Sequence, residues 1–174
     1  MPKTALLQPD LILGGTIFNL TPQIIDSYGI KGLILDVDDT IVSFNNREVS
    51  EQLQEWISAM KKIVPIWLVS NNISQNRIAT IANALDLPYI FSAKKPSRRR
   101  LREAAAEMNL PVERVAMIGD RLFTDVLAGN RLGMFTVLVE PIVDPLVPER
   151  SHPIRSFEVW LSQILGVSLT KFVK

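Results

Sequence analysis

The sequence of 174 residues predicts an α/β fold in which helices cover both faces of a doubly wound, mainly parallel open sheet. Short apolar runs alternate with segments of helical period through the middle of the chain. The connections are short, and two parallel strands can be joined only by a crossover about as long as a helix. The length suits one domain, whose core we expect at about residues 30–140, with 1–29 and 141–174 as extensions.

The first predicted strand is the buried apolar run at residues 32–35. A helix over 50–62 follows, because Ser50 is a suitable N-cap and apolar residues recur after it at helical spacing. The run "VPIWLV" at 64–69 predicts the second strand, and residues 74–85 carry apolar side chains on one helical face. These segments predict the first strand and helix units of the sheet.

The second half of the chain repeats this alternation. A short strand is predicted at 89–91, and an alanine-rich helix follows over 97–108. A strand over 115–118, a helix over 124–132 and a strand over 134–139 complete the expected sheet.

Composition excludes several classes of protein and site. The chain has no cysteine, which removes disulfides, thiolate nucleophiles and thiolate metal sites. Its 19 basic and 18 acidic residues nearly cancel, so the overall charge does not favour a nucleic acid partner. No signal peptide is visible, and the uncharged run at 11–25 is shorter than the ~20 residues of a spanning helix. We expect a cytoplasmic protein and leave peripheral membrane contact open.

Three surface features follow from the remaining segments. Residues 141–155 are rich in proline and predict an irregular segment, in which His152 has no partner motif. Residues 156–165 predict an amphipathic helix, which more often docks on a core than rests on a bilayer. The basic run at 98–102 fits a solvated helix face, the commoner case, or a patch for anionic lipid or a polyanionic substrate. The sequence does not indicate an oligomeric state.

Acidic residues follow the first strand directly, in the run "LILDVDDT" at 33–40. In doubly wound sheets, ligands bind beyond the carboxyl ends of the strands. Asp36 and Asp38 are two positions apart, so at an extended strand end they project to the same side. Carboxylates this close favour a divalent cation between them, and oxygen donors with open water positions suit magnesium.

Other strand ends supply further polar groups. Asp120 and Asp125 lie in "GDRLFTD", directly after the strand predicted at 115–118. We therefore expect a metal held mainly by Asp36 and Asp120, with Asp125 nearby. A lysine such as Lys95, and a hydroxyl such as Ser70 or Thr40, could bind the oxygens of a phosphate. The predicted site would therefore bind a cation and an anionic substrate together.

These groups can perform a two-step hydrolysis of a phosphomonoester. An aspartate such as Asp36 is a competent nucleophile towards phosphorus and forms an aspartyl-phosphate. Asp38 can give a proton to the leaving alcohol and later take one from the attacking water. Magnesium and a lysine would stabilise the charge on the transferred group.

The segments "DVDDT", "SNN", "KKP" and "GDRLFTD" together resemble the four ordered motifs of the haloacid dehalogenase (HAD) superfamily of phosphatases. The resemblance covers about residues 30–140 and implies a HAD-like Rossmannoid fold with bound Mg²⁺. It implies that Asp36 is the nucleophile and Asp38 the general acid and base. It assigns phosphate binding to Thr40, Ser70, Asn71 and Lys95, and metal binding to Asp36, the backbone carbonyl of Asp38 and Asp120. It implies that Asp125 is either a further metal ligand or an acid that contacts the ligands. Lys95 is preferred to Lys94 because it directly precedes the proline, but the doublet leaves that choice open.

The spacing of the motifs is too short for a cap domain at either usual insertion point. A capless site is open, so it needs a lid from a partner or a bulky substrate. The lead-in "GIKGLILDVDDTIV", the segment "SNN" and the continuous run "IGDRLFTDVLAGNRLG" resemble the YqeG-like group, which includes phosphatidylglycerophosphate phosphatases of mitochondria and plastids. That resemblance implies hydrolysis of phosphatidylglycerophosphate to phosphatidylglycerol, with the lipid head group as substrate. Asp39 stands where many relatives have Asn, and we expect this difference to be tolerated.

Three other functions compete with the lipid phosphatase. A phosphatase for a soluble phosphorylated metabolite uses the same residues, so the sequence does not exclude it. A non-catalytic phosphate-binding scaffold is disfavoured, because it has no need for four repelling or desolvated charges at Asp36, Asp38, Lys95 and Asp120. A phosphorylation-switched receiver domain carries its acid pair and its phosphoacceptor on separate strands. In this chain Asp36 and Asp38 follow the same strand, so a receiver domain is disfavoured.

Overall fold

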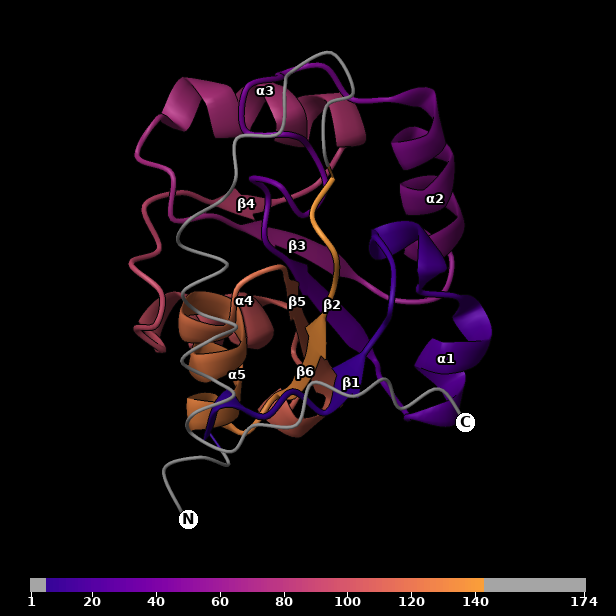
Figure 1. Ribbon diagram of the computed structural model, residues 1–174, viewed down its shortest axis with the longest axis vertical. Helices are drawn as coiled ribbons and strands as arrows, with labels where there is room; N and C mark the ends of the chain where they lie inside the picture. Colours follow the sequence, from indigo (N-terminus) through magenta and orange to yellow (C-terminus); the bar gives the residue numbers. More distant parts are fainter. Residues whose placement is uncertain (1–5, 143–174) are drawn as a thin grey trace.

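The computed structural model describes residues 6–142, which form a six-stranded sheet in the order β1-β6-β5-β2-β3-β4 (Figure 1). Every neighbouring pair of strands is parallel. The strands are β1 (Leu11–Ile12), β2 (Gly32–Leu35), β3 (Ile66–Val69), β4 (Tyr89–Ile90), β5 (Val115–Gly119) and β6 (Phe135–Leu138). The prediction of a doubly wound parallel sheet is confirmed.

Helices connect the strands and cover both faces of the sheet (Figure 1). The α-helices are α1 (Pro22–Ser27), α2 (Glu51–Lys61), α3 (Gln75–Leu85), α4 (Arg99–Glu107) and α5 (Leu127–Leu132). Short 3-10 turns lie at η2 (Ile17–Asn19) and η3 (Val112–Arg114), and one π-helical turn, η4 (Leu122–Val126), precedes α5. Within residues 6–142 no helix combines the length and apolar character that crossing a bilayer requires.

Alternating residues of β2 build two hydrophobic cores. Leu33 and Leu35 pack on one face with side chains of α1, α2 and α3. Ile34 points to the other face, where it packs with Leu101 of α4 and Ala128 of α5. This alternation is the period of two that a strand imposes, and it explains why β2 reads as a continuous apolar run.

Serine caps begin the two helices that flank β3. The Ser50 hydroxyl accepts a hydrogen bond from the Leu53 amide at 3.2 Å, and Ser74 accepts one from the Arg77 amide at 3.4 Å. A cap of this kind stabilises a helix by about 1 kcal/mol. Both helices therefore start one residue after the predicted serine, and their predicted positions are confirmed.

The N-terminal part adds elements that the sequence analysis did not expect. The two-residue strand β1 pairs with β6 at the edge of the sheet. It is held there by Asp10, whose Oδ2 accepts hydrogen bonds from the amide and hydroxyl of Thr136 at 2.8 and 3.0 Å. Two residues are too few to show the period of a strand. The position of β1 depends on these distant partners, so the sequence pattern does not predict it.

The predicted helix over 124–132 needs a correction. It begins at Leu122, and its first part is the π-helical turn η4 rather than regular α-helix. Such turns are often found at functional sites, and here the turn contains Asp125. The predicted helix at 156–165, His152 and the proline-rich segment beyond residue 142 lie outside the described residues.

Candidate active site

The predicted polar residues lie at the carboxyl ends of three neighbouring strands, and these ends form one edge of the sheet. Asp36 follows β2, Ser70 follows β3 and Asp120 follows β5, and these strands are neighbours in the order β5-β2-β3. The Asp36 amide still donates to the Ile118 carbonyl at 2.9 Å, which fixes the end of β2 against β5. The residues 36–50 and 70–74, after β2 and β3, form loops with one isolated bridge, so no cap domain is inserted there.

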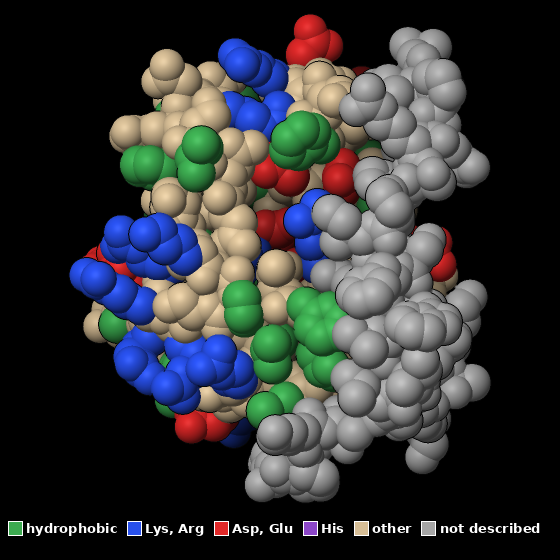
Figure 2. All heavy atoms as spheres, turned by 60° about the vertical axis from the view of Figure 1, so that its left-hand side comes forward, with side chains coloured by type: hydrophobic (Ala, Val, Ile, Leu, Met, Phe, Trp, Pro, Cys, Tyr) green, Lys and Arg blue, Asp and Glu red, His purple; other side chains and the backbone are tan. Residues whose placement is uncertain are grey.

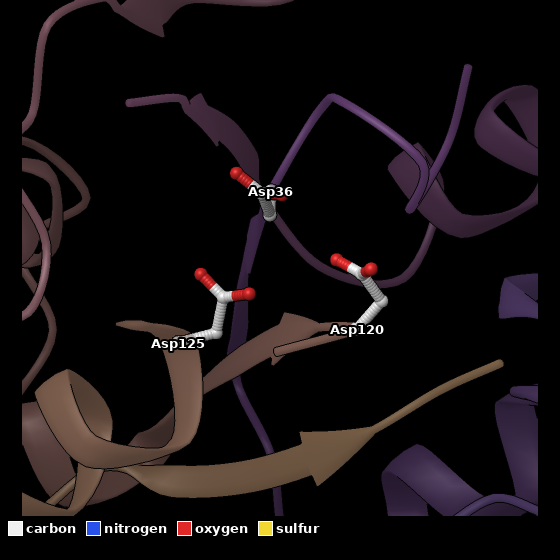
Figure 3. Close-up of side chains that lie close together, drawn as sticks. All are labelled: Asp36, Asp120 and Asp125. Atoms are coloured by element: carbon white, nitrogen blue, oxygen red, sulfur yellow. The ribbon is translucent and has the colours of Figure 1, made fainter. Parts of the chain in front are cut away.

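Asp36, Asp120 and Asp125 point towards one another in a buried cluster, here called the acid cluster (Figure 3). Each offers one carboxylate oxygen, and these oxygens lie within 4.8 Å of one another. The Oδ1 atom of Asp125 is buried and accepts no hydrogen bond, although it forms an ion pair with the Lys95 ammonium at 2.7 Å. Hard oxygen donors of this kind suit Mg²⁺ or Ca²⁺, and a cation would relieve the repulsion among the three acids. The acid cluster therefore fits a divalent metal ion.

The electrostatics of the acid cluster favour protonation when no cation is bound. Burial raises the pKa of Asp36 to about 6, although the nearby Lys95 ammonium opposes the shift. Burial and the charges of Asp125 and Asp36 raise the pKa of Asp120 to about 8. A bound cation would displace these protons, so metal binding and proton release should be coupled.

Lys95 supplies the positive charge at the acid cluster. Its Nζ lies 2.6 Å from Asp36 Oδ1 and 2.7 Å from Asp125 Oδ1, and donates to the Val69 carbonyl at 2.9 Å. Burial alone would lower the pKa of Lys95, but the charges of Asp125 and Asp36 outweigh it and raise the pKa to about 12. Lys95 is therefore an ammonium at all physiological pH values. Lys94 is exposed, so the structure places Lys95, the preferred lysine, at the acid cluster.

Asn71 fixes the backbone of Lys95. Its side-chain carbonyl accepts from the Lys95 amide at 2.7 Å, and its side-chain amide donates to the Lys95 carbonyl at 3.0 Å. This reciprocal pair ties the loop after β3 to the loop after β4. Asn71 lines the pocket, but these contacts give it a positioning role, and its phosphate contact stays a prediction.

The two predicted hydroxyls contact carboxylates. Thr40 is fully buried and donates to Asp120 Oδ1 at 3.3 Å. Ser70 donates to Asp38 Oδ2 at 3.4 Å and accepts from the Asn72 amide at 3.0 Å. Both therefore orient acids of the site, and their predicted contacts with phosphate stay predictions.

Arg77, which the sequence analysis did not single out, holds the Asp38 carboxylate. Its Nε and Nη2 donate to Asp38 Oδ1 at 3.0 and 2.9 Å. The same guanidinium donates to the carbonyls of Ser43 (3.1 Å) and Asn46, so it also fixes the loop after β2. Asp38 Oδ2 accepts from the neutral Asn72 side chain at 3.1 Å. Oδ2 is thus the oxygen whose bonds can exchange most easily with a substrate, while Arg77 retains Oδ1.

One sequence signal could have pointed to Arg77. It lies in the first turn of α3, where the helix dipole disfavours a cation unless an acid from elsewhere compensates. The structure shows that the compensating acid is Asp38, 39 positions earlier in the chain. Sequence spacing alone does not identify that partner.

An open pocket of about 330 Å³ leads to the acid cluster. On this face of the molecule, acidic side chains lie in a hollow, with basic and hydrophobic side chains around it (Figure 2). The pocket is lined by Asp36, Asp38, Phe44, Asn71, Asn72, Ile73, Lys95, Arg121 and Thr124. A substrate entering it would meet Asp36, Asp38 and Lys95 together.

The parallel sheet, with the four motifs meeting at the carboxyl ends of its strands, defines a phosphatase of the haloacid dehalogenase class. A family model described as "HAD-hyrolase-like" matches residues 92–141. The protein named Probable phosphatase YqeG, from Bacillus subtilis, is 37% identical over 127 residues, which cover 72% of this chain and 73% of that protein. The chain belongs to the YqeG-like family of phosphatases within the HAD superfamily.

One further relative and one solved structure are similar to this chain. The mitochondrial phosphatidylglycerophosphatase GEP4 of Saccharomyces cerevisiae is 27% identical, and the match covers 93% of this chain and 91% of that protein. The crystal structure of YfnB from Bacillus subtilis, described as a HAD hydrolase bound to magnesium, has a TM-score of 0.53 and 15% identity. The match covers 69% of this chain and 91% of YfnB, and a similarity at 15% identity supports the fold alone.

Gly119→Ala is expected to weaken metal binding about tenfold, because a Cβ there would meet the Asp125 carboxylate and lie 2.6 Å from Asp125 Cβ. Titration calorimetry with Mg²⁺ measures the change. Gly32→Ala is the matched control, since its Cβ would crowd Leu110 at the opposite end of β2. The control should lower stability and keep the Mg²⁺ affinity; equal affinities in all three proteins would contradict the position of Asp125 in the metal site.

The pKa shifts predict how the stability of the metal-free protein depends on pH. Folding raises the pKa of Asp36 to about 6 and that of Asp120 to about 8, so the folded chain binds more protons than the unfolded chain above pH 4. In EDTA the melting temperature should therefore fall between about pH 5 and pH 8. Added Mg²⁺ should raise it most at the alkaline end.

Asp120→Asn tests this pH dependence, because it removes the group that titrates at the upper end. The variant should show a flatter decline between pH 6 and pH 8 in EDTA. An unchanged slope would contradict the raised pKa of Asp120. Lys95 does not interfere, since its raised pKa affects stability only above pH 10.

Proposed function

We propose that this phosphatase hydrolyses a phosphomonoester through an aspartyl-phosphate on Asp36, with Mg²⁺ bound at the acid cluster and phosphatidylglycerophosphate as substrate. The meeting of Asp36, Lys95 and the acid cluster in one open pocket carries the proposal. Asp36, Asp120 and Asp125, with the Asp38 backbone carbonyl, would hold the ion. When bound, Mg²⁺ would supply charge stabilisation for the phosphoryl oxygens.

In the first step, a carboxylate oxygen of Asp36 attacks phosphorus and the ester P–O bond breaks. The leaving alkoxide takes a proton from Asp38, whose Oδ2 is held by the neutral donors Asn72 and Ser70. The buried Lys95 keeps its positive charge and stabilises the negative charge of the phosphoryl group in the pocket.

In the second step, water attacks the phosphorus of the aspartyl-phosphate and releases inorganic phosphate. Asp38, now a carboxylate, takes a proton from that water, which returns both residues to their starting states. Because Arg77 holds Asp38 Oδ1 throughout, the same oxygen, Oδ2, can serve in both steps.

Two observations support a lipid substrate. The relative GEP4 is named a phosphatidylglycerophosphatase, and the match spans nearly all of both chains. The pocket of about 330 Å³ has room for a phosphate and a glycerol but not for two acyl chains, and no cap is inserted after β2 or β3 to enclose them. The acyl chains would therefore stay outside the pocket, at a membrane surface.

Phosphate release by the purified protein tests the proposal. Phosphatidylglycerophosphate in mixed micelles is compared with soluble phosphomonoesters, with and without Mg²⁺, and Asp36→Asn serves as the blank. A lipid preference of at least tenfold in kcat/KM is expected. Preference for a soluble ester would keep the mechanism and replace the substrate. Absence of Mg²⁺-dependent release from every substrate would overturn the proposal.

A further inference from the structure

Two exposed apolar side chains stand at the mouth of the active-site pocket. Among the described residues, the large hydrophobic side chains with high exposure are Tyr28 (47%), Phe44 (57%), Ile63 (48%) and Ile73 (83%). Phe44 and Ile73 line the pocket, and we call this pair the apolar rim. Tyr28 and Ile63 precede β2 and β3, so they lie towards the opposite edge of the sheet. Single exposed apolar side chains are common, but a pair that flanks a catalytic pocket indicates a surface that binds another molecule.

The fold holds the apolar rim outward. The Phe44 amide donates to Asp39 Oδ1 at 2.9 Å, and the guanidinium carbon of Arg77 lies 5.9 Å from the centre of the Phe44 ring. Ile73 is followed by Ser74, whose amide donates to Asn72 Oδ1 at 2.9 Å. These contacts fix the backbone on both sides of the pocket, so the exposure is a property of the folded loops.

The charges around the apolar rim complement an anionic surface. The segments that follow β2, β3, β4, β5 and β6 at this end of the sheet, with the first residues of the helices after them, span residues 36–51, 70–75, 91–99, 120–126 and 139–142. Their exposed charged residues are Arg47, Lys94, Arg98 and Arg99 on the positive side and Glu48, Glu51 and Glu140 on the negative side. Each basic residue near an anionic bilayer contributes about 1 kcal/mol of attraction, which weakens as salt is added. Exposed apolar side chains at an end of the sheet where basic residues outnumber acidic ones suit a bilayer of anionic lipid better than a neutral protein surface.

We propose that Phe44 and Ile73 insert into the surface of an anionic bilayer and bring the pocket directly over the phosphate of a membrane-embedded substrate. This inference rests on the proposed lipid substrate and adds the surface by which the protein reaches it. The exposed cations would attract the anionic head groups, and the apolar rim would enter the interface beside the substrate. The phosphate would then reach Asp36 and Lys95 while the acyl chains remain in the membrane.

A single-site label tests the contact directly. The chain has no cysteine, so Ile73→Cys introduces a unique thiol for an environment-sensitive fluorophore. Vesicles of phosphatidylglycerol and phosphatidylcholine should shift the emission at position 73 to the blue, and pure phosphatidylcholine should shift it less. Ile63→Cys is the control, because Ile63 is also an exposed isoleucine but lies away from the pocket. Equal shifts at both positions, or no shift at position 73, would overturn the proposal.

Activity provides the second measurement. The double variant Phe44→Ser/Ile73→Ser should lower kcat/KM for phosphatidylglycerophosphate in vesicles, relative to that for a soluble ester, by at least tenfold. Ile63→Ser should leave this ratio unchanged. Ile73→Ser alone should give an intermediate loss, and it avoids the contact of Phe44 with Arg77.

These outcomes separate the apolar rim from the proposed function. If the wild-type protein hydrolyses no lipid, the proposed substrate fails, and the fluorescence at position 73 still decides the membrane contact. If it hydrolyses the lipid and the double variant keeps the wild-type ratio, the apolar rim proposal fails alone. A double variant that binds vesicles normally but loses self-association in light scattering would assign the surface to a second copy of the chain, which also overturns the proposal.

Discussion

Asp36→Asn should lower Mg²⁺-dependent phosphate release by at least about 10³-fold, because an amide cannot form the aspartyl-phosphate. Asp36 stands at the end of β2, beside Lys95 and the acid cluster, where a nucleophile must meet the phosphoryl group. Substrate binding should change much less, since Lys95, Asp120 and Asp125 remain. The expected result is a large loss in kcat with a small change in KM.

The same variant should keep or increase the stability of the metal-free protein. Burial raises the pKa of Asp36 from 3.8 to about 6, so ionising it in the folded chain at pH 7.5 opposes folding by about 3 kcal/mol at most. The amide that replaces the Asp36 carboxylate would carry no charge, and Lys95 would still have Asp125 as a partner at 2.7 Å. In EDTA the free energy of unfolding should therefore be unchanged or higher by up to that amount.

A surface aspartate provides the control for this variant. Asp26 is exposed, and Asp26→Asn should change neither activity nor stability appreciably. A loss of several kcal/mol in Asp36→Asn would show that Asp36 is mainly structural. Normal Mg²⁺-dependent turnover by Asp36→Asn would exclude it as the nucleophile. An inactive but more stable variant is the result that a functional acid, buried at a cost to stability, should give.

The sequence predicts the central sheet and the position of its functional edge well, because both depend on short-range patterns. β2 reads as a strand from four consecutive residues without a charge, and α2 from a serine cap followed by helical spacing. Parallel strands place their carboxyl ends at one edge, so Asp36, Ser70 and Asp120 had to meet. Their proximity was predictable before any distance was known.

The hydrogen-bond partners within the site could not be predicted in the same way. Thr40 and Ser70 are predicted to bind phosphate, and the structure adds contacts of both hydroxyls with carboxylates, which the motifs do not indicate. Arg77 reaches Asp38 from another helix, and only the folded chain brings these two residues together. Choices among several acceptors within a few ångströms depend on side-chain geometry, which motif spacing does not determine.

Arg77→Met should lower kcat/KM for an alkyl phosphate about 100-fold, because Asp38 would lose the two hydrogen bonds that fix its Oδ1. A general acid contributes most when the leaving group is a poor one. The loss should therefore be below about tenfold for an aryl phosphate such as p-nitrophenyl phosphate, whose leaving group needs little protonation. Arg77→Lys keeps the charge but offers a single donor nitrogen in place of the two that bind Asp38, and it should restore part of the activity on the alkyl ester.

The effect of Arg77 on stability must be measured separately from its effect on the position of Asp38. Arg77 is buried, and its replacement by Met also removes its hydrogen bonds to the Ser43 and Asn46 carbonyls. A destabilisation of about 3 kcal/mol is expected from this change. Ile25→Ala in α1, distant from the pocket, should destabilise the chain by a similar amount. The two variants are compared by melting temperature and by kcat/KM on both esters.

If Arg77 positions Asp38, only the Arg77 variant will discriminate between the alkyl and the aryl ester. An equal loss on both esters, or an equal loss in Ile25→Ala, would assign Arg77 a purely structural role. The first outcome would give Arg77 two connected tasks, because the same guanidinium holds both the proposed general acid and the loop that carries Phe44. A displacement of that loop at a membrane surface would then move Arg77 and change the position of the Asp38 carboxylate.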